Sequence, residues 1–172
     1  MTPRPLVVRL RNWVGDVILS VPALRLLQSH GYSLELVGKG WAVSLLTGEG
    51  WRVHVRPHAL RARIAQLKAL GRNARTADSS FDARENALVL PSSFSAALEM
   101  RLAGLKAVGY AAEARSPLLA RALPSVREGH ELVRTWTLAC RFLGTHAAPP
   151  NAIALRTDAI DQDRADTMLA AH

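Results

Sequence analysis

The sequence is poor in the residue types that several classes of protein depend on. Its one cysteine, Cys140, allows no internal disulfide and no cysteine-based zinc site, and it fits a reducing compartment. The six histidines show no metal-ligand spacing, so we expect no metal. No apolar run approaches the roughly 20 residues of a membrane-spanning helix, and no signal-peptide pattern opens the chain. These absences favour a cytoplasmic globular protein.

Acidic residues are also scarce, and the chain is strongly basic. Against 14 Asp and Glu stand 22 Lys and Arg, which gives a net charge of +8 and a pI near 10.9. This charge suits anionic partners: nucleic acid, an acidic membrane surface, or a phosphorylated or carboxylated substrate. The arginines are dispersed, however, and aromatic residues are only 5%, which is few for stacking bases. We therefore expect no nucleic-acid partner, and dispersed arginine on solvated faces remains the plain alternative.

Strand and helix patterns alternate along the chain. Strand patterns occupy residues 6–10, 33–37, 51–55, 86–90 and 106–111, with helical spacing between them. This order predicts an α/β, Rossmann-like, doubly wound parallel sheet with 6–10 as a central strand. We further expect a loop at 71–85, a loop at 112–126 with a helical turn at 118–122, and a helix at 127–143. After a boundary at Pro149-Pro150 we expect a strand at 152–155 and a helix at 159–171.

The turn after the first predicted strand carries Gly15-Asp16, and helical spacing starts at Val17. Asp16 is therefore expected at the carboxyl end of a strand and at the start of a helix. One interpretation is an N-cap, which accepts backbone N–H groups and complements the helix dipole. The other is a carboxylate base at the mouth of a cleft. The turn has one glycine, so it is not a GxGxxG dinucleotide fingerprint.

Two more turns place polar residues at carboxyl ends of predicted strands. Lys39 follows the second strand and is either a surface lysine or a ligand contact. Ser92, Ser93 and Ser95 surround Phe94 after the strand at 86–90. Serines at the start of a helix can cap it, or they can bind a phosphate, carboxylate or sugar together with the helix N–H groups.

Two stretches resemble one enzyme family. Residues 9–27, RLRNWVGDVILSVPALRLL, resemble the opening of the family 9 glycosyltransferases, the ADP-heptose:lipopolysaccharide heptosyltransferases. The form NWVGD at 12–16 is most similar to the heptosyltransferase II branch. Residues 87–119 are similar to the strand, Pro-x-Ser-Phe turn, helix, Gly-Tyr strand and Arg-containing loop of that branch. The resemblance covers nearly the whole chain, but only the amino-terminal half of such an enzyme.

The resemblance implies a GT-B architecture, in which an amino-terminal domain takes the acceptor and a second domain takes the nucleotide-sugar. Residues 1–148 would be the acceptor-binding domain, and 149–172 a linker and the start of the donor domain, whose motifs are absent. We accordingly expect a fragment, or a degenerate non-catalytic relative.

The implied reaction is inverting, metal-independent transfer of heptose from ADP-heptose to the lipopolysaccharide inner core, at the inner face of the inner membrane, without a cofactor. Asp16 would be the base. The implied substrate contacts are Asn12, Trp13, Gly15, Lys39, Ser92, Ser93, Phe94 and Arg115. The rival from another class is a basic binding module for nucleic acid or anionic ligands, without catalysis.

Overall fold

One six-stranded parallel sheet forms the centre of the molecule. The computed structural model describes residues 3–125, 129–157 and 159–170. The strand order is β3 (Arg52–Val55), β2 (Tyr32–Gly38), β1 (Arg4–Arg9), β4 (Ala87–Val89), β5 (Ala107–Tyr110) and β6 (Arg121–Leu123). Every pairing is parallel, including those of β1 with β2 and with β4. The predicted fold class and the central place of the first strand are confirmed.

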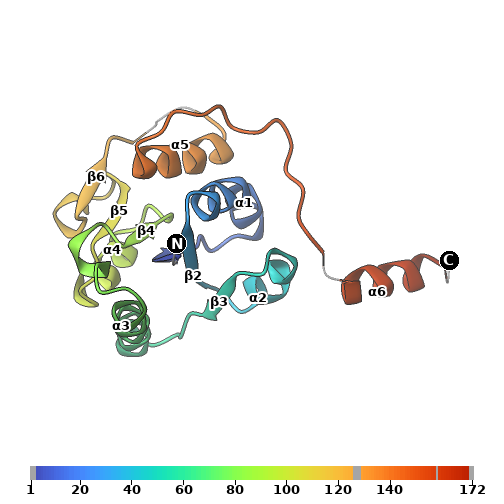
Figure 1. Cartoon of the computed structure of the whole chain (residues 1–172), viewed down its shortest axis with the longest axis horizontal. Helices are drawn as coiled ribbons and strands as arrows, with labels where there is room; N and C mark the ends of the chain where they lie inside the picture. Colours follow the sequence, from blue (N-terminus) through green and yellow to red (C-terminus); the bar gives the residue numbers. More distant parts are fainter. Residues whose placement is uncertain (1–2, 126–128, 158, 171–172) are drawn as a thin grey trace.

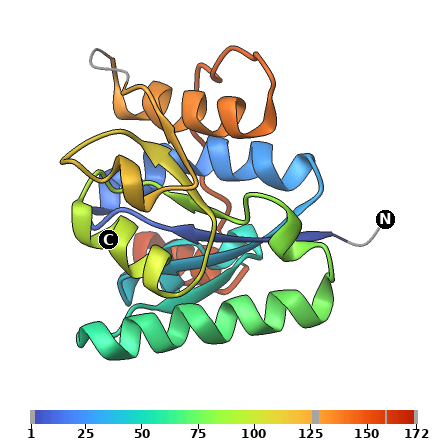
Figure 2. The same cartoon turned by 90° about the vertical axis from the view of Figure 1, so that its left-hand side faces the viewer.

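Helices cover both faces of the sheet (Figures 1 and 2). One face is covered by α1 (Val14–Ser29) and α5 (Glu131–Leu143), and the other by α3 (Leu60–Ala77) and α4 (Phe94–Leu102). The alternation of β1 explains both layers, because Leu6 and Val8 enter the core cluster of α1 and α5, whereas Val7 enters the cluster of α3 and α4. The short helices α2 (Trp41–Leu45) and η1 (Thr47–Glu49) lead into β3.

The direction of winding reverses between β1 and β4. From β1 the chain builds outward through β2 to β3, then returns through α3 to β4 on the other side of β1 and builds outward to β6. In open parallel sheets the ligand crevice lies at such a switch point, beyond the carboxyl ends of the strands. The β1–α1 and β4–α4 turns flank this point, and they carry most of the predicted site residues.

The prediction of a loop at 71–85 is wrong for its first half. Helix α3 continues to Ala77, and a short 3-10 helix, η2 (Phe81–Ala83), follows it. Gly71 and Ala74 are buried on α3, and a Cβ on Gly71 would lie 3.4 Å from a methyl carbon of Leu105. These small residues let α3 lie close to its neighbours. In the sequence, the polar composition of residues 71–85 had indicated a loop.

Two more predictions near the carboxyl end of the chain are wrong. In place of a helical turn at 118–122, the structure has the 3-10 helix η3 (Ser116–Leu118) and the strand β6. Residues 152–157 form no strand and run as an extended segment to α6 (Ala159–Ala170), which stands apart from the layers (Figure 1). The predicted helix at 127–143 begins at Glu131, and residues 126–128 lie outside the described part.

Of the helices in the described residues, none combines the length and the apolar character needed to cross a membrane.

Candidate functional site at the carboxyl edge of the sheet

Asp16 lies at the switch point, in the first turn of α1. The N-cap of α1 is Trp13, which has an extended backbone and makes no side-chain cap bond. Asp16 is three residues beyond it and half-buried. The N-cap interpretation of Asp16 is therefore wrong, because the helix starts earlier than the apolar spacing indicated. The negative charge of Asp16 still stabilises α1, because it lies near the positive end of the helix dipole. Its role as a base stays a prediction.

The residues around Asp16 leave space beside it. A Cβ on Gly15 would meet no atom within 4 Å, so packing does not require glycine there. The Trp13 side chain is 75% exposed, and Asn12 is also exposed. The Asn12 Oδ1 accepts a hydrogen bond of 3.1 Å from Arg9 Nη2, which anchors this end of the turn to β1. An anchored turn with an open side and an exposed ring suits a ligand that lies over it.

The serine turn, residues 92–95, follows β4, the strand next to β1, and leads into α4. The first turn of α4 is not capped by a serine. Ser93 is the N-cap residue of α4 but makes no side-chain cap bond. Instead, the N–H of Phe94 donates a 3.0 Å hydrogen bond to Glu113, a residue of the turn after β5. The simple capping interpretation of Ser93 is therefore wrong. An anion at this helix end would compete with a carboxylate, whereas Ser92, Ser93 and the 43% exposed Phe94 remain accessible.

Arg115 is directed into the protein interior. Its side chain is fully buried, and its guanidinium donates to the carbonyl oxygens of Tyr110 (2.8 Å), Pro91 and Ser93 (3.4 Å). Burial lowers the pKa of Arg115 to about 10, so the side chain is charged at neutral pH. The structure thus corrects its predicted role as a substrate contact. Arg115 ties the turn after β5 to the serine turn after β4.

Lys39 is exposed just beyond the carboxyl end of β2, the strand next to β1. The topology therefore brings the turns of Lys39, Asp16 and the serines to the same edge of the sheet, beyond three adjacent strands.

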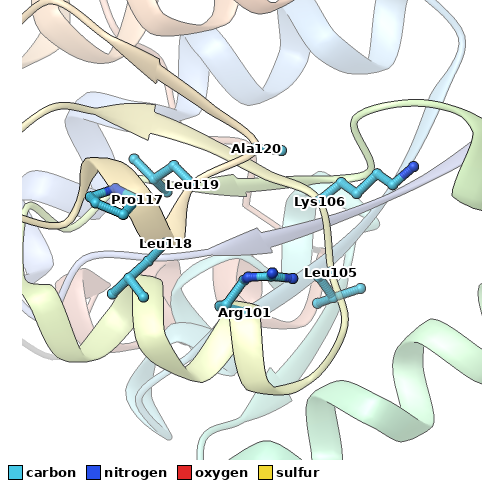
Figure 3. A pocket seen from close by; sticks show the side chains of 7 residues that line it. All are labelled: Arg101, Leu105, Lys106, Pro117, Leu118, Leu119 and Ala120. Atoms are coloured by element: carbon cyan, nitrogen blue, oxygen red, sulfur yellow. The ribbon is translucent and has the colours of Figure 1, made fainter.

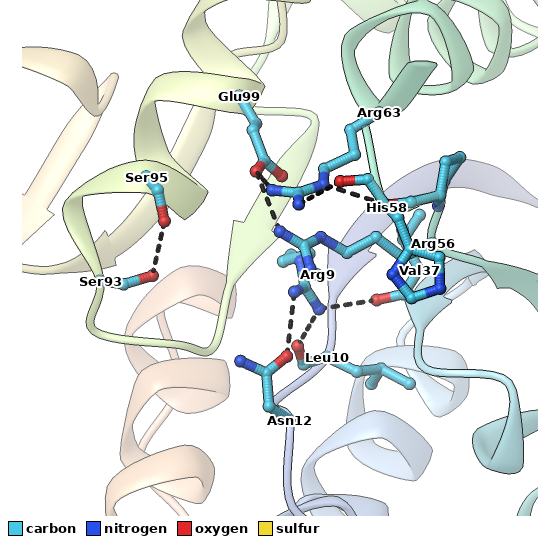
Figure 4. A network of polar contacts seen from close by, with 11 residues as sticks. Arg9, Leu10, Asn12, Val37, Arg56, His58, Arg63, Ser93, Ser95 and Glu99 are labelled. Atoms are coloured by element: carbon cyan, nitrogen blue, oxygen red, sulfur yellow. Dashed lines mark hydrogen bonds and ion pairs between the residues drawn. The ribbon is translucent and has the colours of Figure 1, made fainter. Parts of the chain in front are cut away.

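A cluster of arginines at this edge was missed by the sequence analysis (Figure 4). Glu99 of α4 is 1% exposed and pairs with two arginines, Arg56 Nη2 at 3.1 Å and Arg63 Nη1 at 2.8 Å. Arg9, at the end of β1, is 3% exposed and donates through Nη1 to the carbonyl oxygens of Leu10 (2.5 Å) and Val37 (3.3 Å). We call Arg9, Arg56, Arg63 and Glu99 the arginine cluster.

The arginine cluster carries excess positive charge. Three guanidinium groups accompany one carboxylate, and burial, followed by the charge of Arg56, lowers the pKa of Arg9 to about 10. Arg9 remains protonated at neutral pH, so the cost of its burial is borne by the fold. The Nε atoms of Arg9 and Arg56 are buried without a hydrogen-bond partner. This part of the carboxyl edge therefore favours a ligand with a carboxylate or phosphate group.

One member of the arginine cluster could have been found from the sequence. Arg9 interrupts the apolar run of 6–10, and a charge inside a buried strand is an informative exception. The pairing of Arg56 and Arg63 with Glu99 joins residues 43 and 36 positions apart, so no local pattern indicates it.

We expect Glu99→Gln to lower the free energy of unfolding by about 2–3 kcal/mol, because it leaves three neighbouring guanidinium groups without a carboxylate. Urea denaturation measures this loss. Glu85→Gln is the matched control, since Glu85 pairs with Arg121 at a site where the two side chains are 31% and 38% exposed. The control should cost less than about 1 kcal/mol. Equal losses in the two variants would show that the arginine cluster is an ordinary surface network.

A cavity at the opposite end of the sheet contains none of the predicted site residues (Figure 3). Its volume is about 270 Å³, and it lies beside the amino ends of β5 and β6. The lining residues are Arg101, Leu105, Lys106, Pro117, Leu118, Leu119 and Ala120. It is therefore separate from the residues at the carboxyl edge.

Comparison with solved structures identifies the fold as one found in glycosyltransferases. The chain is similar to a family 9 glycosyltransferase from Veillonella parvula, with a TM-score of 0.74 and 13% identity over 98% of this chain and 49% of that one. It is similar to the Escherichia coli ADP-heptose lipopolysaccharide heptosyltransferase II, with a TM-score of 0.68 and 22% identity over 96% and 50%.

A third similar structure is the E. coli heptosyltransferase WaaC with ADP-2-deoxy-2-fluoro heptose, with a TM-score of 0.59 and 19% identity over 86% of this chain and 50% of that chain. No family model and no curated protein sequence matches the chain. The resemblance that the two sequence motifs indicated is thus confirmed in the fold. The chain spans about half the length of the structures that it matches.

Proposed function

We propose that this chain is the acceptor-binding half of a GT-B glycosyltransferase that transfers heptose from ADP-heptose to the inner core of lipopolysaccharide. The observation that carries the proposal is the position of Asp16. It lies at the switch point of a fold shared with heptosyltransferases, in a turn that resembles theirs. A rival binding module without chemistry would need no carboxylate at this point of a basic crevice.

In the proposed reaction an acceptor hydroxyl attacks the anomeric carbon of the donor heptose. The new C–O bond forms as the bond to the ADP phosphate oxygen breaks, and the configuration at carbon inverts. Asp16 takes the hydroxyl proton, which requires its carboxylate within hydrogen-bond reach of the attacking oxygen. Holding the two substrates in line lowers the barrier further. No step requires a metal ion.

The charge of the crevice supports an acidic acceptor. The arginine cluster would face the phosphates and carboxylates of the inner core, with Lys39 at the next strand. The exposed rings of Trp13 and Phe94 offer apolar faces for sugar rings. The net charge of +8 would draw the protein to the anionic inner leaflet of the inner membrane, which implies a cytoplasmic, peripheral location.

Calorimetry on the chain as it stands tests the proposal. We expect an inner-core oligosaccharide to bind more tightly than ADP, because the donor site is assigned to the other half of the enzyme. Arg56→Gln should weaken oligosaccharide binding about tenfold, the size of one charge-assisted hydrogen bond. Arg101→Gln, at the far end of α4, is the control and should leave it unchanged.

Two results would contradict the proposal. Micromolar binding of ADP would show that the donor site is misplaced. Salt-dependent binding of duplex DNA, without affinity for the oligosaccharide, would favour the nucleic-acid module.

A further inference from the structure

Residues 154–156 are held against the body of the protein through their main chain. Arg25 of α1 donates from Nη2 to the carbonyl oxygen of Ala154 at 2.7 Å. The N–H of Arg156 donates to Oε1 of Glu49 at 3.0 Å. Between these two contacts, the Leu155 side chain packs against the core cluster of α1 and α5. We call residues 154–156 the strap.

The two side chains that hold the strap are fixed by one another. Arg25 donates to both carboxylate oxygens of Glu49, from Nε at 2.9 Å and from Nη2 at 2.6 Å. The Glu49 side chain is 1% exposed. Burial by itself would raise the pKa of Glu49, but the hydrogen bonds from Arg25 and from the Arg156 N–H outweigh burial and lower it. The pair is therefore ionised and preorganised, with one donor and one acceptor directed at the strap.

Gly48 makes room for the strap. A Cβ on Gly48 would lie 2.0 Å from the carbonyl oxygen and 2.4 Å from the carbonyl carbon of Arg156. Both neighbours are main-chain atoms, which cannot turn aside as a flexible side chain can. The backbone of Gly48 does not occupy the left-handed region, in contrast to Gly50 at φ +69°. The close approach of the strap, and not backbone conformation, is what requires glycine at this position.

Together these residues recognise a pattern of main-chain groups. The pattern is a carbonyl oxygen, an apolar side chain on the next residue, and an N–H on the residue after it. The chain is drawn out along this stretch (Figure 1). Recognition by β-strand addition uses the same main-chain groups, but here side chains of α1 and η1 supply the partners.

We propose that Arg25, Gly48 and Glu49 form a binding site for an extended peptide segment, whose occupant is the strap of this same chain. The site fixes the course of the chain before α6, which stands apart from the layers (Figure 1). The inference does not depend on the proposed transferase function, because it concerns only contacts within the described residues.

Recognition through the main chain predicts an unusual pattern of mutational effects. Gly48→Ala should displace the strap, and Arg25→Met should remove both a strap contact and the partner of Glu49. Arg156→Ala should have a much smaller effect, because the contacts with the strap site are made by the N–H and carbonyl of Arg156. Its side chain contributes only its charge, the smallest of the effects that lower the pKa of Glu49. Leu155→Ala should loosen the strap by an intermediate amount, since it removes apolar contacts and leaves the hydrogen bonds.

Hydrogen exchange of the full 172-residue chain tests this pattern. We expect the Arg156 N–H to exchange at least tenfold faster in Gly48→Ala and Arg25→Met than in wild type, as loss of about one hydrogen bond implies. Protection of the β1 and β2 amides should stay unchanged, which shows that the fold is intact. Limited proteolysis between residues 150 and 157 should accelerate in the same two variants.

The proposal is overturned if the Arg156 N–H keeps its protection in Gly48→Ala, because the strap would then not rest on Gly48. It is equally overturned if Arg156→Ala and Gly48→Ala loosen the strap alike. If Gly48→Ala also reduces protection in β1 and β2, its fold is disturbed, and Arg25→Met is compared with Arg156→Ala instead. Equal exchange rates of the residue 156 N–H in these two variants would then overturn the proposal.

Discussion

On the proposed function, replacing Asp16 by asparagine is expected to lower the turnover of the complete enzyme by about 10²–10⁴-fold. Asparagine keeps the shape of the side chain but cannot accept the acceptor's proton. Because Trp13 and not Asp16 is the N-cap of α1, the change should alter the free energy of unfolding by less than about 1 kcal/mol, through the lost interaction with the helix dipole. Turnover and melting temperature, measured beside wild type, give the two numbers.

Asp16→Ala is the matched control for this prediction. If the carboxylate acts as a base, alanine and asparagine should impair turnover to a similar degree, and both should leave acceptor affinity nearly unchanged, since the loss lies in the transition state. Turnover within a few-fold of wild type in Asp16→Asn would rule out the base. A large loss of stability in either variant would show that the first turn of α1 depends on the carboxylate more than its position indicates.

The sheet and its winding were predictable because the signals were local. β4 is buried throughout and β1 nearly so, and both appear as apolar runs, interrupted in β1 by Arg9. Each run is followed by a turn and a helical period. The same local order places Asp16 and the serine turn at the ends of strands. Parallel pairing then brings those ends to one edge. The position of the crevice therefore follows from the sequence pattern and a rule of topology.

The parts that could not be predicted depend on contacts between distant residues. β6 is three residues long and half-buried, so it lacks a clear period, and its pairing with β5 alone makes it a strand. The arginine cluster joins β1, α3 and α4. The strap rests on Gly48 and Glu49, and Glu49 is 107 positions away from Arg156 in the sequence. No local pattern in the sequence indicates these contacts.

Arg115 shows the same limit at a single residue. The resemblance implied a substrate contact at Arg115, but sequence position does not give the direction of a side chain. The structure turns it inward, over Gly109, where a Cβ would lie 3.2 Å from its Nη2 atom. A charged residue near a crevice is thus not by itself a ligand contact. Here it supports the loop that carries the half-buried Ser93 and the exposed Phe94.

We expect Arg115→Met to lower the free energy of unfolding by about 2–4 kcal/mol. Methionine fills much of the buried volume but leaves the carbonyl oxygens of Tyr110, Pro91 and Ser93 without their donor. Part of this cost is offset, because methionine also removes the desolvation of a buried cation, the effect that lowers the pKa of Arg115. Urea denaturation measures the net change.

The control for Arg115 is Arg141→Met, which removes a bond of 3.1 Å to the carbonyl oxygen of Pro124 at an exposed site and should cost less than about 1 kcal/mol. Exchange at the Phe94 amide distinguishes a brace from a ligand contact. If Arg115 braces the two turns, its loss separates Phe94 from Glu113, and the Phe94 N–H exchanges faster without any ligand present. Unchanged stability and exchange, with acceptor affinity lost, would instead make Arg115 a substrate contact in a conformation other than this one.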